Sequence, residues 1–272
     1  EKTMKKIELM SQKNGEPFIQ LDKEKRWYWH LDPMAQVSGP RSSGKTFFLY
    51  YLMLSVAEIG ADIYILDPKR SDLSSLQFCY PEKDRESHIA TTPTKICKVL
   101  RELNTLMNER YEKYFQVESS KIGADAHELK LRPIFIFFDE VLALIEEDKK
   151  LGKEAEQYLK TIILKGRQSG IYVVISSQRL SADTLNTVIR ENCGLRVIFG
   201  KVQEESYKMA LGESFKKLPR AEKGVGKGYI YLDGQGWQTP KAFMAPYMDT
   251  SKMNIRAIFK DLLNNSSTLY LE

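Results

Sequence analysis

Apolar residues along the chain fall into two kinds of pattern. Five short, mainly apolar runs predict strands, and three of them are apolar on both faces, as expected at the centre of a parallel sheet. Two longer stretches, residues 94–118 and 154–164, predict helices, the first from apolar residues repeating at three- and four-residue steps. The alternation of strands and helices predicts an α/β fold with a mostly parallel central sheet flanked by helices. The five runs are residues 34–38, 62–66, 134–138, 171–177 and 195–199.

The two ends of the chain show weaker patterns. "WYWHL", residues 27–31, predicts a strand or the edge of one, and its aromatic side chains favour packing into a core over stacking on a nucleotide base. Near the other end, "GYIYLDGQGWQTPKAFMAP" predicts a β-hairpin that turns at Asp233-Gly234. We therefore expect a strand-rich lead-in at residues 1–33, a main domain at 34–247 and a tail at 248–272.

Composition narrows the class of protein only a little. The net charge of +5 tolerates a nucleic-acid partner without requiring one. Three cysteines without paired spacing indicate a reducing compartment and no structural metal. No apolar run approaches the roughly 20 residues that cross a bilayer. Because the sequence opens with Glu1 instead of methionine, the chain is consistent with a piece of a longer protein.

"GPRSSGKT", residues 39–46, follows an apolar run and precedes a helical one that stops at Gly60. This is the P-loop pattern, in which backbone N–H groups surround a phosphate beside a helix N-terminus. Lys45 is expected to reach the β- and γ-phosphates of ATP, or less favourably GTP, and Thr46 to hold Mg²⁺. The residues expected around the nucleotide are Gly39, Pro40, Arg41, Ser42, Ser43, Gly44, Lys45 and Thr46.

Polar residues at the ends of two other apolar runs suggest hydrolysis. Asp139 ends "IFIFFD" and is expected to be the second Mg²⁺ ligand. Glu140 follows it and is expected to activate the attacking water, although it can also be a residue that stabilises a helix N-terminus. Gln178 can sense the γ-phosphate or be a solvated loop residue. Arg167 precedes the apolar run at residues 171–177, which Gln178 follows. From the residues alone, Arg167 is best explained as forming a surface salt bridge.

Several stretches, in order, resemble the motor domain of the FtsK/SpoIIIE DNA translocases. They are "GPRSSGKT", "ILDPKRSDLSSL" at residues 65–76, "LRELNTLMNERYEKY" at 100–114, "LGKEAEQYLKTIILKGRQSGIYVVISSQRLS" at 151–181 and "NTVIRENCGLRVIFGKVQEESYKMALG" at 186–212. The P-loop alone is weakly specific, whereas the ordered combination, which spans residues 39–232, is strong.

The resemblance implies a RecA-like ATPase that assembles as a hexameric ring and pumps DNA through its centre. It implies that Arg167 is an arginine finger acting on a neighbouring subunit, and it supports Gln178 as the γ-phosphate sensor. Lys149, Lys150 and Lys153 fall near the family's DNA-facing loop. There they can hold phosphates without reading bases, or they can be a solvated charge run.

The sequence also departs from the family pattern. Leu180 replaces a proline, and Pro40 and Arg41 stand in the P-loop where small residues are usual. Asp67 and Lys69 either line a subunit interface or shape the loop after a strand. No segment resembles the winged-helix module of chromosome translocases. The pattern therefore favours a compact relative, a coupling ATPase of Gram-positive conjugative elements, in the cytoplasm at the inner face of the membrane with an anchor in a longer parent chain.

Two other functions stay open at this stage. The same motor can serve as a type VII-like protein-secretion ATPase, whose ligand is a polypeptide signal instead of DNA. Alternatively, the P-loop can belong to a binding module that switches on nucleotide without turnover. Glu140 and Gln178 speak against this last alternative, because a switch needs no group that activates water.

Overall fold

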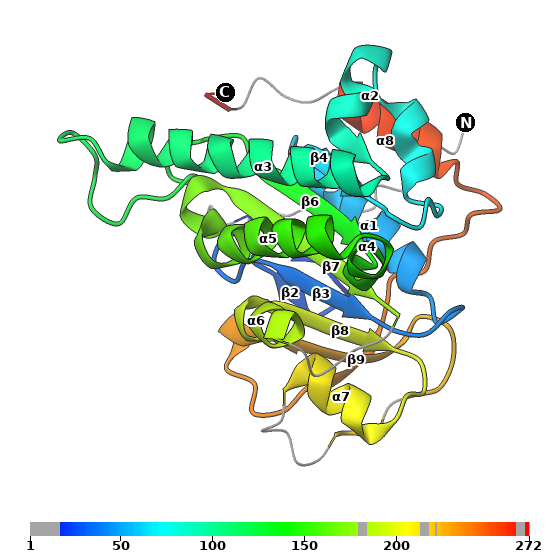
Figure 1. Ribbon diagram of the computed structural model, residues 1–272. Helices are drawn as coiled ribbons and strands as arrows, with labels where there is room; N and C mark the ends of the chain where they lie inside the picture. Colours follow the sequence, from blue (N-terminus) through cyan, green and yellow to red (C-terminus); the bar gives the residue numbers. More distant parts are fainter. Residues whose placement is uncertain (1–16, 179–183, 213–217, 221, 265–269, 272) are drawn as a thin grey trace.

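The computed structural model describes residues 17–178, 184–212, 218–220, 222–264 and 270–271. These residues form an eight-stranded sheet, in the order β10-β9-β8-β3-β7-β6-β4-β5, with helices on both faces (Figure 1), and a separate two-stranded ribbon, β1-β2. The predicted α/β class is confirmed. The strands are β1 (Ile19–Gln20), β2 (Arg26–Trp27), β3 (Ala35–Ser38), β4 (Asp62–Leu66), β5 (Ile89–Ala90), β6 (Ile134–Asp139), β7 (Ile171–Ser177), β8 (Leu195–Phe199), β9 (Lys227–Leu232) and β10 (Lys241–Met244).

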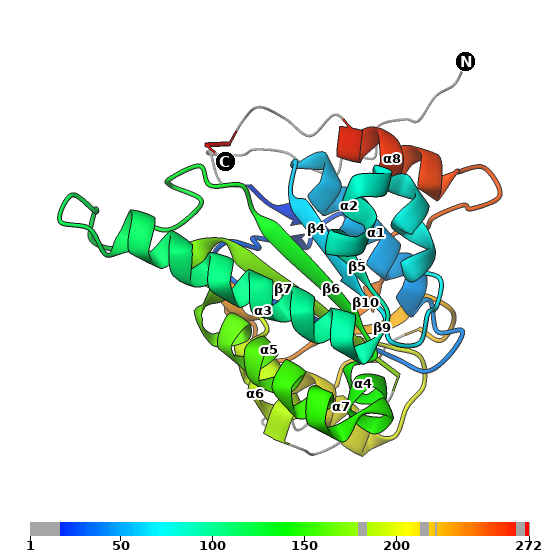
Figure 2. The ribbon, with the colours of Figure 1, turned by 45° about the horizontal axis from the view of Figure 1, so that its top comes forward.

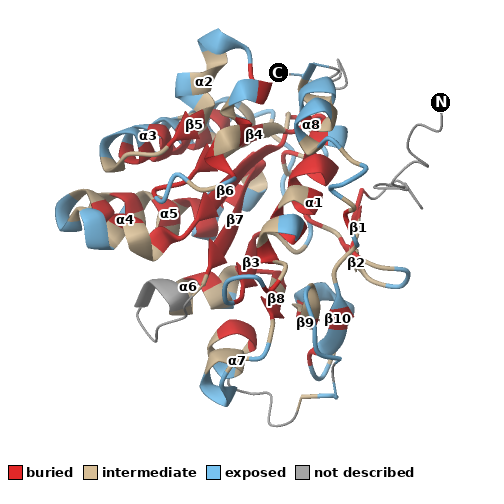
Figure 3. Ribbon diagram, turned by 90° about the vertical axis from the view of Figure 1, so that its right-hand side faces the viewer, coloured by how far each residue is buried: buried red, intermediate tan, exposed pale blue. Residues whose placement is uncertain are grey.

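Helices cover the sheet in two layers. On one face α1 packs over the sheet and α8 packs on α1, while α3, α4, α5 and α6 pack over the other face (Figure 2). Figure 3 shows the buried strands between these layers. The helices are α1 (Lys45–Glu58), α2 (Glu82–His88), α3 (Pro93–Arg110), α4 (Val141–Glu147), α5 (Lys149–Ser169), α6 (Thr184–Asn192), α7 (Glu204–Leu211) and α8 (Ile255–Asn264), with 3₁₀ turns η1 (Ser74–Cys79) and η3 (Asp233–Gln235) and a π-helical turn η2 (Tyr111–Phe115).

In the order of the sheet, the six strands from β8 to β5 run parallel to one another, and β9 is antiparallel to both of its neighbours, β8 and β10. The predicted C-terminal hairpin is therefore confirmed, but its turn differs. The chain does not reverse in a two-residue turn at Asp233-Gly234. Instead, the N–H of Asp233 donates to the carbonyl of Gly194 at 3.0 Å, and its carboxylate lies 2.6 Å from Nη2 of Arg196 on β8. The link between β9 and β10 consequently runs through η3 to residue 240.

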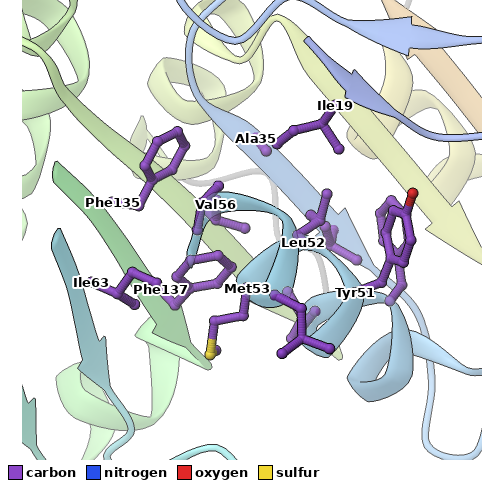
Figure 4. Close-up of a cluster of buried hydrophobic side chains, with 14 of the residues drawn as sticks. Ile19, Ala35, Tyr51, Leu52, Met53, Val56, Ile63, Phe135 and Phe137 are labelled. Atoms are coloured by element: carbon purple, nitrogen blue, oxygen red, sulfur yellow. The ribbon is translucent and has the colours of Figure 1, made fainter. Parts of the chain in front are cut away.

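The core under α1 fixes the position of the helix that follows the P-loop. Leu52, Met53 and Val56 of α1 pack against Phe135 and Phe137 of β6 (Figure 4), and all five are at most 1% exposed. Burying each such side chain contributes about 1.5–3 kcal/mol. The amino end of α1 is thereby held at the carboxyl edge of the sheet.

The predicted strand at residues 27–31 is only partly correct. β2 ends at Trp27, and the chain then turns, with the N–H of Asp32 donating to the carbonyl of Tyr28 at 2.9 Å. The indole N–H of Trp27 closes the turn by donating to the carbonyl of Asp32 at 2.7 Å. Trp29 is buried and packs edge-on against Tyr172, with ring centroids 5.2 Å apart. The prediction that these aromatics pack into the core is confirmed, while residues 1–16 of the expected lead-in lie outside the described residues.

The predicted helices are present with different ends. α5 is longer than the predicted 154–164, because Asp148 caps it by accepting hydrogen bonds from the N–H groups of Lys150 and Leu151, both at 2.9 Å. Within the expected tail, α8 packs on α1 and buries Phe259 against Tyr80. None of the helices in the described ranges combines the length and the apolar character that a bilayer-spanning segment needs.

Candidate active site

The P-loop, the acidic pair and Gln178 meet at one edge of the sheet. They follow β3, β6 and β7, which lie side by side in the order β3-β7-β6. Because these strands are parallel, their carboxyl ends share one edge, the usual place for a ligand in an α/β sheet. The chain thus brings together residues that are up to 139 positions apart, from Gly39 to Gln178.

The P-loop has the backbone shape of a phosphate cradle. Ser42 and Gly44 have φ of 60° and 96°, in the left-handed region, and α1 begins at the next residue, Lys45. Successive N–H groups in such a turn form a concave anion-binding nest. A cavity of about 530 Å³ opens beside it. Its lining residues are Pro40, Arg41, Ser42, Gly44, Lys45, Thr46, Phe47, Gln178 and Val225.

The loop at residues 224–226, which was not among the predicted site residues, forms a hydrogen bond with the P-loop. The N–H of Gly226 donates to the carbonyl of Ser43 at 2.7 Å, and the carbonyl of Gly226 accepts from Ala245 on the way out of β10. Val225 beside it is 68% exposed and lines the cavity. The two glycines on either side of Val225 indicate a turn in the sequence, but whether that turn contacts the P-loop depends on the strand order.

Gly44 lies so close to this loop that no side chain fits. A Cβ there would lie 2.5 Å from the nitrogen and 2.8 Å from the Cα of Gly226, and φ is +96°. We expect Gly44→Ala to lower the free energy of unfolding by about 1–3 kcal/mol and to weaken ATPγS binding at least tenfold. Chemical denaturation and calorimetric titration measure the two effects. Gly123→Ala is the matched control, because its φ is +81° and nothing lies within 4 Å of a Cβ there; equal losses in both variants would contradict the clash.

Lys45 connects the P-loop to the acidic pair. Its Nζ lies 2.9 Å from Oε1 of Glu140 and 3.8 Å from Oδ1 of Asp139. All three side chains are nearly buried, with exposures of 7%, 6% and 11%. Since buried carboxylates are costly without a partner, the ammonium group of Lys45 offsets part of the negative charge of this pair.

Two serines orient the carboxylate of Asp139. Ser176, its register partner on β7, donates a hydrogen bond to Oδ1, and the hydroxyl of Ser71 lies 3.2 Å from Oδ2. Ser71 also lies 3.0 Å from Oδ2 of Asp67. Ser71 and Ser176 were not among the predicted site residues, because a serine in a strand or in the loop after one carries no signal of its own.

Glu140 adopts an uncommon backbone conformation. Its φ and ψ are 55° and 61°, left-handed for a residue with a side chain, and it precedes the first residue of α4. Its N–H donates to the carbonyl of Ser176 at 3.0 Å, which holds the turn. Such strain persists only where the surroundings determine it, and it is common at functional sites. The second oxygen of Glu140 lies 3.6 Å from Nζ of Lys69, which follows β4.

Arg167 lies far from this cluster within the chain. It sits in the last turn of α5, just before β7 begins, and its Nε donates to the carbonyl of His30 at 3.2 Å. The seven residues of β7 separate it from the P-loop edge, a rise of about 20 Å. By contrast, Lys149, Lys150 and Lys153 are exposed in the first turns of α5.

No protein-family model matches the chain. The FtsK domain-containing protein YdcQ of Bacillus subtilis is 32% identical over 212 residues, which cover 78% of this chain and 43% of that protein. The DNA translocase FtsK of Chlorobaculum tepidum is 23% identical over 235 residues, covering 82% of this chain and 28% of that protein. Over most of its length the chain therefore matches the FtsK-type proteins named here.

Solved structures agree with an FtsK-type fold. The pCW3 conjugation coupling protein TcpA, in a monomer form with ATPγS, superposes with a TM-score of 0.72 at 20% identity, over 91% of this chain and 71% of that one. The type VII secretion ATPase EccC of Thermomonospora curvata gives 0.60 at 17% identity, over 85% of this chain and 28% of that one. This FtsK-type chain spans less than half the length of the curated relatives described above.

Proposed function

We propose that the chain is the ATP-hydrolysing motor of a DNA translocase, acting as a coupling ATPase in conjugative DNA transfer. The observation that carries this proposal is the buried Lys45–Glu140–Asp139 cluster beside a P-loop cavity, in a chain that matches FtsK-type proteins. A nucleotide-binding module without turnover has no need for a buried carboxylate fixed beside the phosphate site. The likeness to a conjugation coupling protein supports the transfer role.

Each residue of the site has a defined task in this proposal. Lys45 turns from Glu140 to the β- and γ-phosphates, and Glu140 accepts a proton from the attacking water. Thr46 and Asp139 would hold Mg²⁺, for which a hydroxyl and a carboxylate are suitable oxygen ligands. The ion neutralises phosphate charge when it is bound. Gln178 lines the same cavity, which supports its proposed contact with the γ-phosphate.

In a ring of subunits, Arg167 can act on the nucleotide of a neighbouring copy, which a single chain does not allow. Because it lies at the edge opposite the P-loop, it can reach a nucleotide only on a neighbouring copy. A head-to-tail, heterologous contact brings opposite edges together and closes into a ring when the rotation allows it. We propose a homo-hexamer in which Arg167 stabilises the charge of phosphoryl transfer on the neighbour, an effect of about 10³–10⁵ in rate.

The proposed DNA contacts are non-specific. Lys149, Lys150 and Lys153 place three positive charges on the exposed start of α5. Lysines that contact phosphates bind DNA of any sequence and lose affinity as salt rises. We further propose that a membrane anchor in the longer parent protein holds the motor at the inner face of the cell membrane.

The test is the ATPase rate against protein concentration, with duplex DNA, single-stranded DNA, candidate signal peptides or no ligand. We expect a steep rise with concentration and stimulation by DNA at low salt. Arg167→Ala should remove the steep dependence, whereas Lys165→Ala, on the same turn of α5, should keep it. Stimulation by peptides but not by DNA would reject the translocase in favour of a secretion motor.

A further inference from the structure

The carboxylate of Glu140 is held between two lysines from different parts of the chain. Lys45 of the P-loop approaches Oε1 at 2.9 Å, and Lys69, in the loop after β4, approaches Oε2 at 3.6 Å. The two cations differ in their surroundings. The side chain of Lys45 is 7% exposed, whereas that of Lys69 is 41% exposed and reaches the carboxylate from the solvent side.

Nucleotide binding sets up a competition for only one of these lysines. The ammonium group of a P-loop lysine is needed by the β- and γ-phosphates. When Lys45 turns to them, Glu140 loses its closer partner while its side chain stays buried at 6% exposure. A carboxylate left buried without a cation is strongly unfavourable and tends to move. Lys69 is the cation already in place to prevent this.

The loop that carries Lys69 is fixed by buried contacts. Asp67 is fully buried, and its Oδ2 accepts hydrogen bonds from the N–H of Ser74 at 3.1 Å and the hydroxyl of Ser71 at 3.0 Å. The N–H of Arg70, which has a φ of 51°, donates to the carbonyl of Asp67 at 3.1 Å. The backbone of Lys69 is therefore enclosed in a tight turn that is bonded, through Ser71, to Asp139.

We propose that Lys69 is a positioning residue for ATP hydrolysis: its ammonium group holds the carboxylate of Glu140 in place once Lys45 has moved to the nucleotide phosphates. This inference rests on the proposed role of Glu140 in activating water. A general base works only within hydrogen-bond distance of the proton it removes, so a displaced Glu140 slows the chemical step without changing how ATP binds.

The test is the turnover of Lys69→Ala and Lys69→Arg with saturating duplex DNA. We expect kcat to fall about tenfold in Lys69→Ala with the KM for ATP within about twofold, and we expect Lys69→Arg to recover at least half of kcat. Arg70→Gln is the matched control, because Arg70 is an exposed cation in the same turn and should keep full turnover. An unchanged kcat in Lys69→Ala would overturn the proposal.

Two further measurements separate this role from others. If Lys69 acts through Glu140, adding Lys69→Ala to Glu140→Gln should cause no further loss in single-turnover rate, and an additive loss would overturn the proposal. If Lys69 instead contacted the γ-phosphate, Lys69→Ala would weaken ATPγS binding but not ADP binding, which would also overturn it. An inactive Glu140→Gln beside a fully active Lys69→Ala would refute the role of Lys69 alone and leave the proposed role of Glu140 intact.

Discussion

Replacing Lys45 with alanine is expected to abolish ATP turnover, with a loss of about 10³-fold or more in kcat/KM. The ammonium group supplies the positive charge for the β- and γ-phosphates, and among the described residues Arg41 is the one other cation that lines the cavity. Initial-rate assays over a range of ATP concentrations measure the loss. Turnover within tenfold of the unmodified chain would contradict the assignment of this loop as the nucleotide site.

The same substitution should also destabilise the protein without nucleotide. It removes the closest cation from Glu140 and Asp139, which are both nearly buried, and leaves Lys69 as a partner for only one of them. We expect the free energy of unfolding to fall by about 2–3 kcal/mol. The double variant Lys45→Ala/Glu140→Gln should recover most of this stability but none of the activity, which separates the electrostatic effect from the catalytic one.

Replacing Glu140 with glutamine is expected to lower kcat by about 10²–10⁴, the usual contribution of a general base. It should at the same time tighten the binding of ATPγS by about three- to tenfold. The reason is that Lys45 no longer leaves a charged partner at 2.9 Å when it turns to the phosphates. Opposite changes in turnover and affinity are difficult to obtain from misfolding, so the pair of measurements tests the geometry directly.

A matched control for this substitution lies at the other end of α4, the helix that Glu140 precedes. Glu147 is the last residue of α4 and is exposed, so Glu147→Gln removes one charge without touching the cluster. It should leave both kcat and the dissociation constant for ATPγS within about twofold. Weaker nucleotide binding in Glu140→Gln would show that the Lys45–Glu140 pair does not compete with the phosphates.

The central strands could be predicted well because their burial requires a run of mainly apolar residues, which is visible in the sequence. β4, β7 and β8 have the predicted bounds, residues 62–66, 171–177 and 195–199. A strand covered on both faces is apolar at most of its positions, and this pattern can be recognised without knowing the neighbouring strands. The ends of the chain lacked this signal. β2 is cut short by the indole of Trp27, which bonds five residues ahead, a contact that no periodicity reports.

The predicted site residues also divide into those that a local pattern identifies and those that it does not. The P-loop, Asp139 and Gln178 could be named in advance, because each stands directly after an apolar run and parallel strands present such residues at one edge. Arg167 could not be assigned a role by local pattern, since it lies at the far edge of the sheet and its proposed role depends on a second copy of the chain. The supports of the site, namely Ser71, Ser176 and the Gly226 loop, come from other strands and have no motif of their own.

The amino-acid sequence therefore determines which groups are available for the chemistry: a phosphate cradle, a lysine, an acidic pair and a polar residue at the strand ends. Only the tertiary structure decides which of them are partners. Lys45 and Glu140 are 95 residues apart, and Lys69 reaches the same carboxylate from a third strand. Spacing along the chain encodes local geometry, whereas the pairing of buried charges depends on strand order, and strand order is set by how the whole core packs.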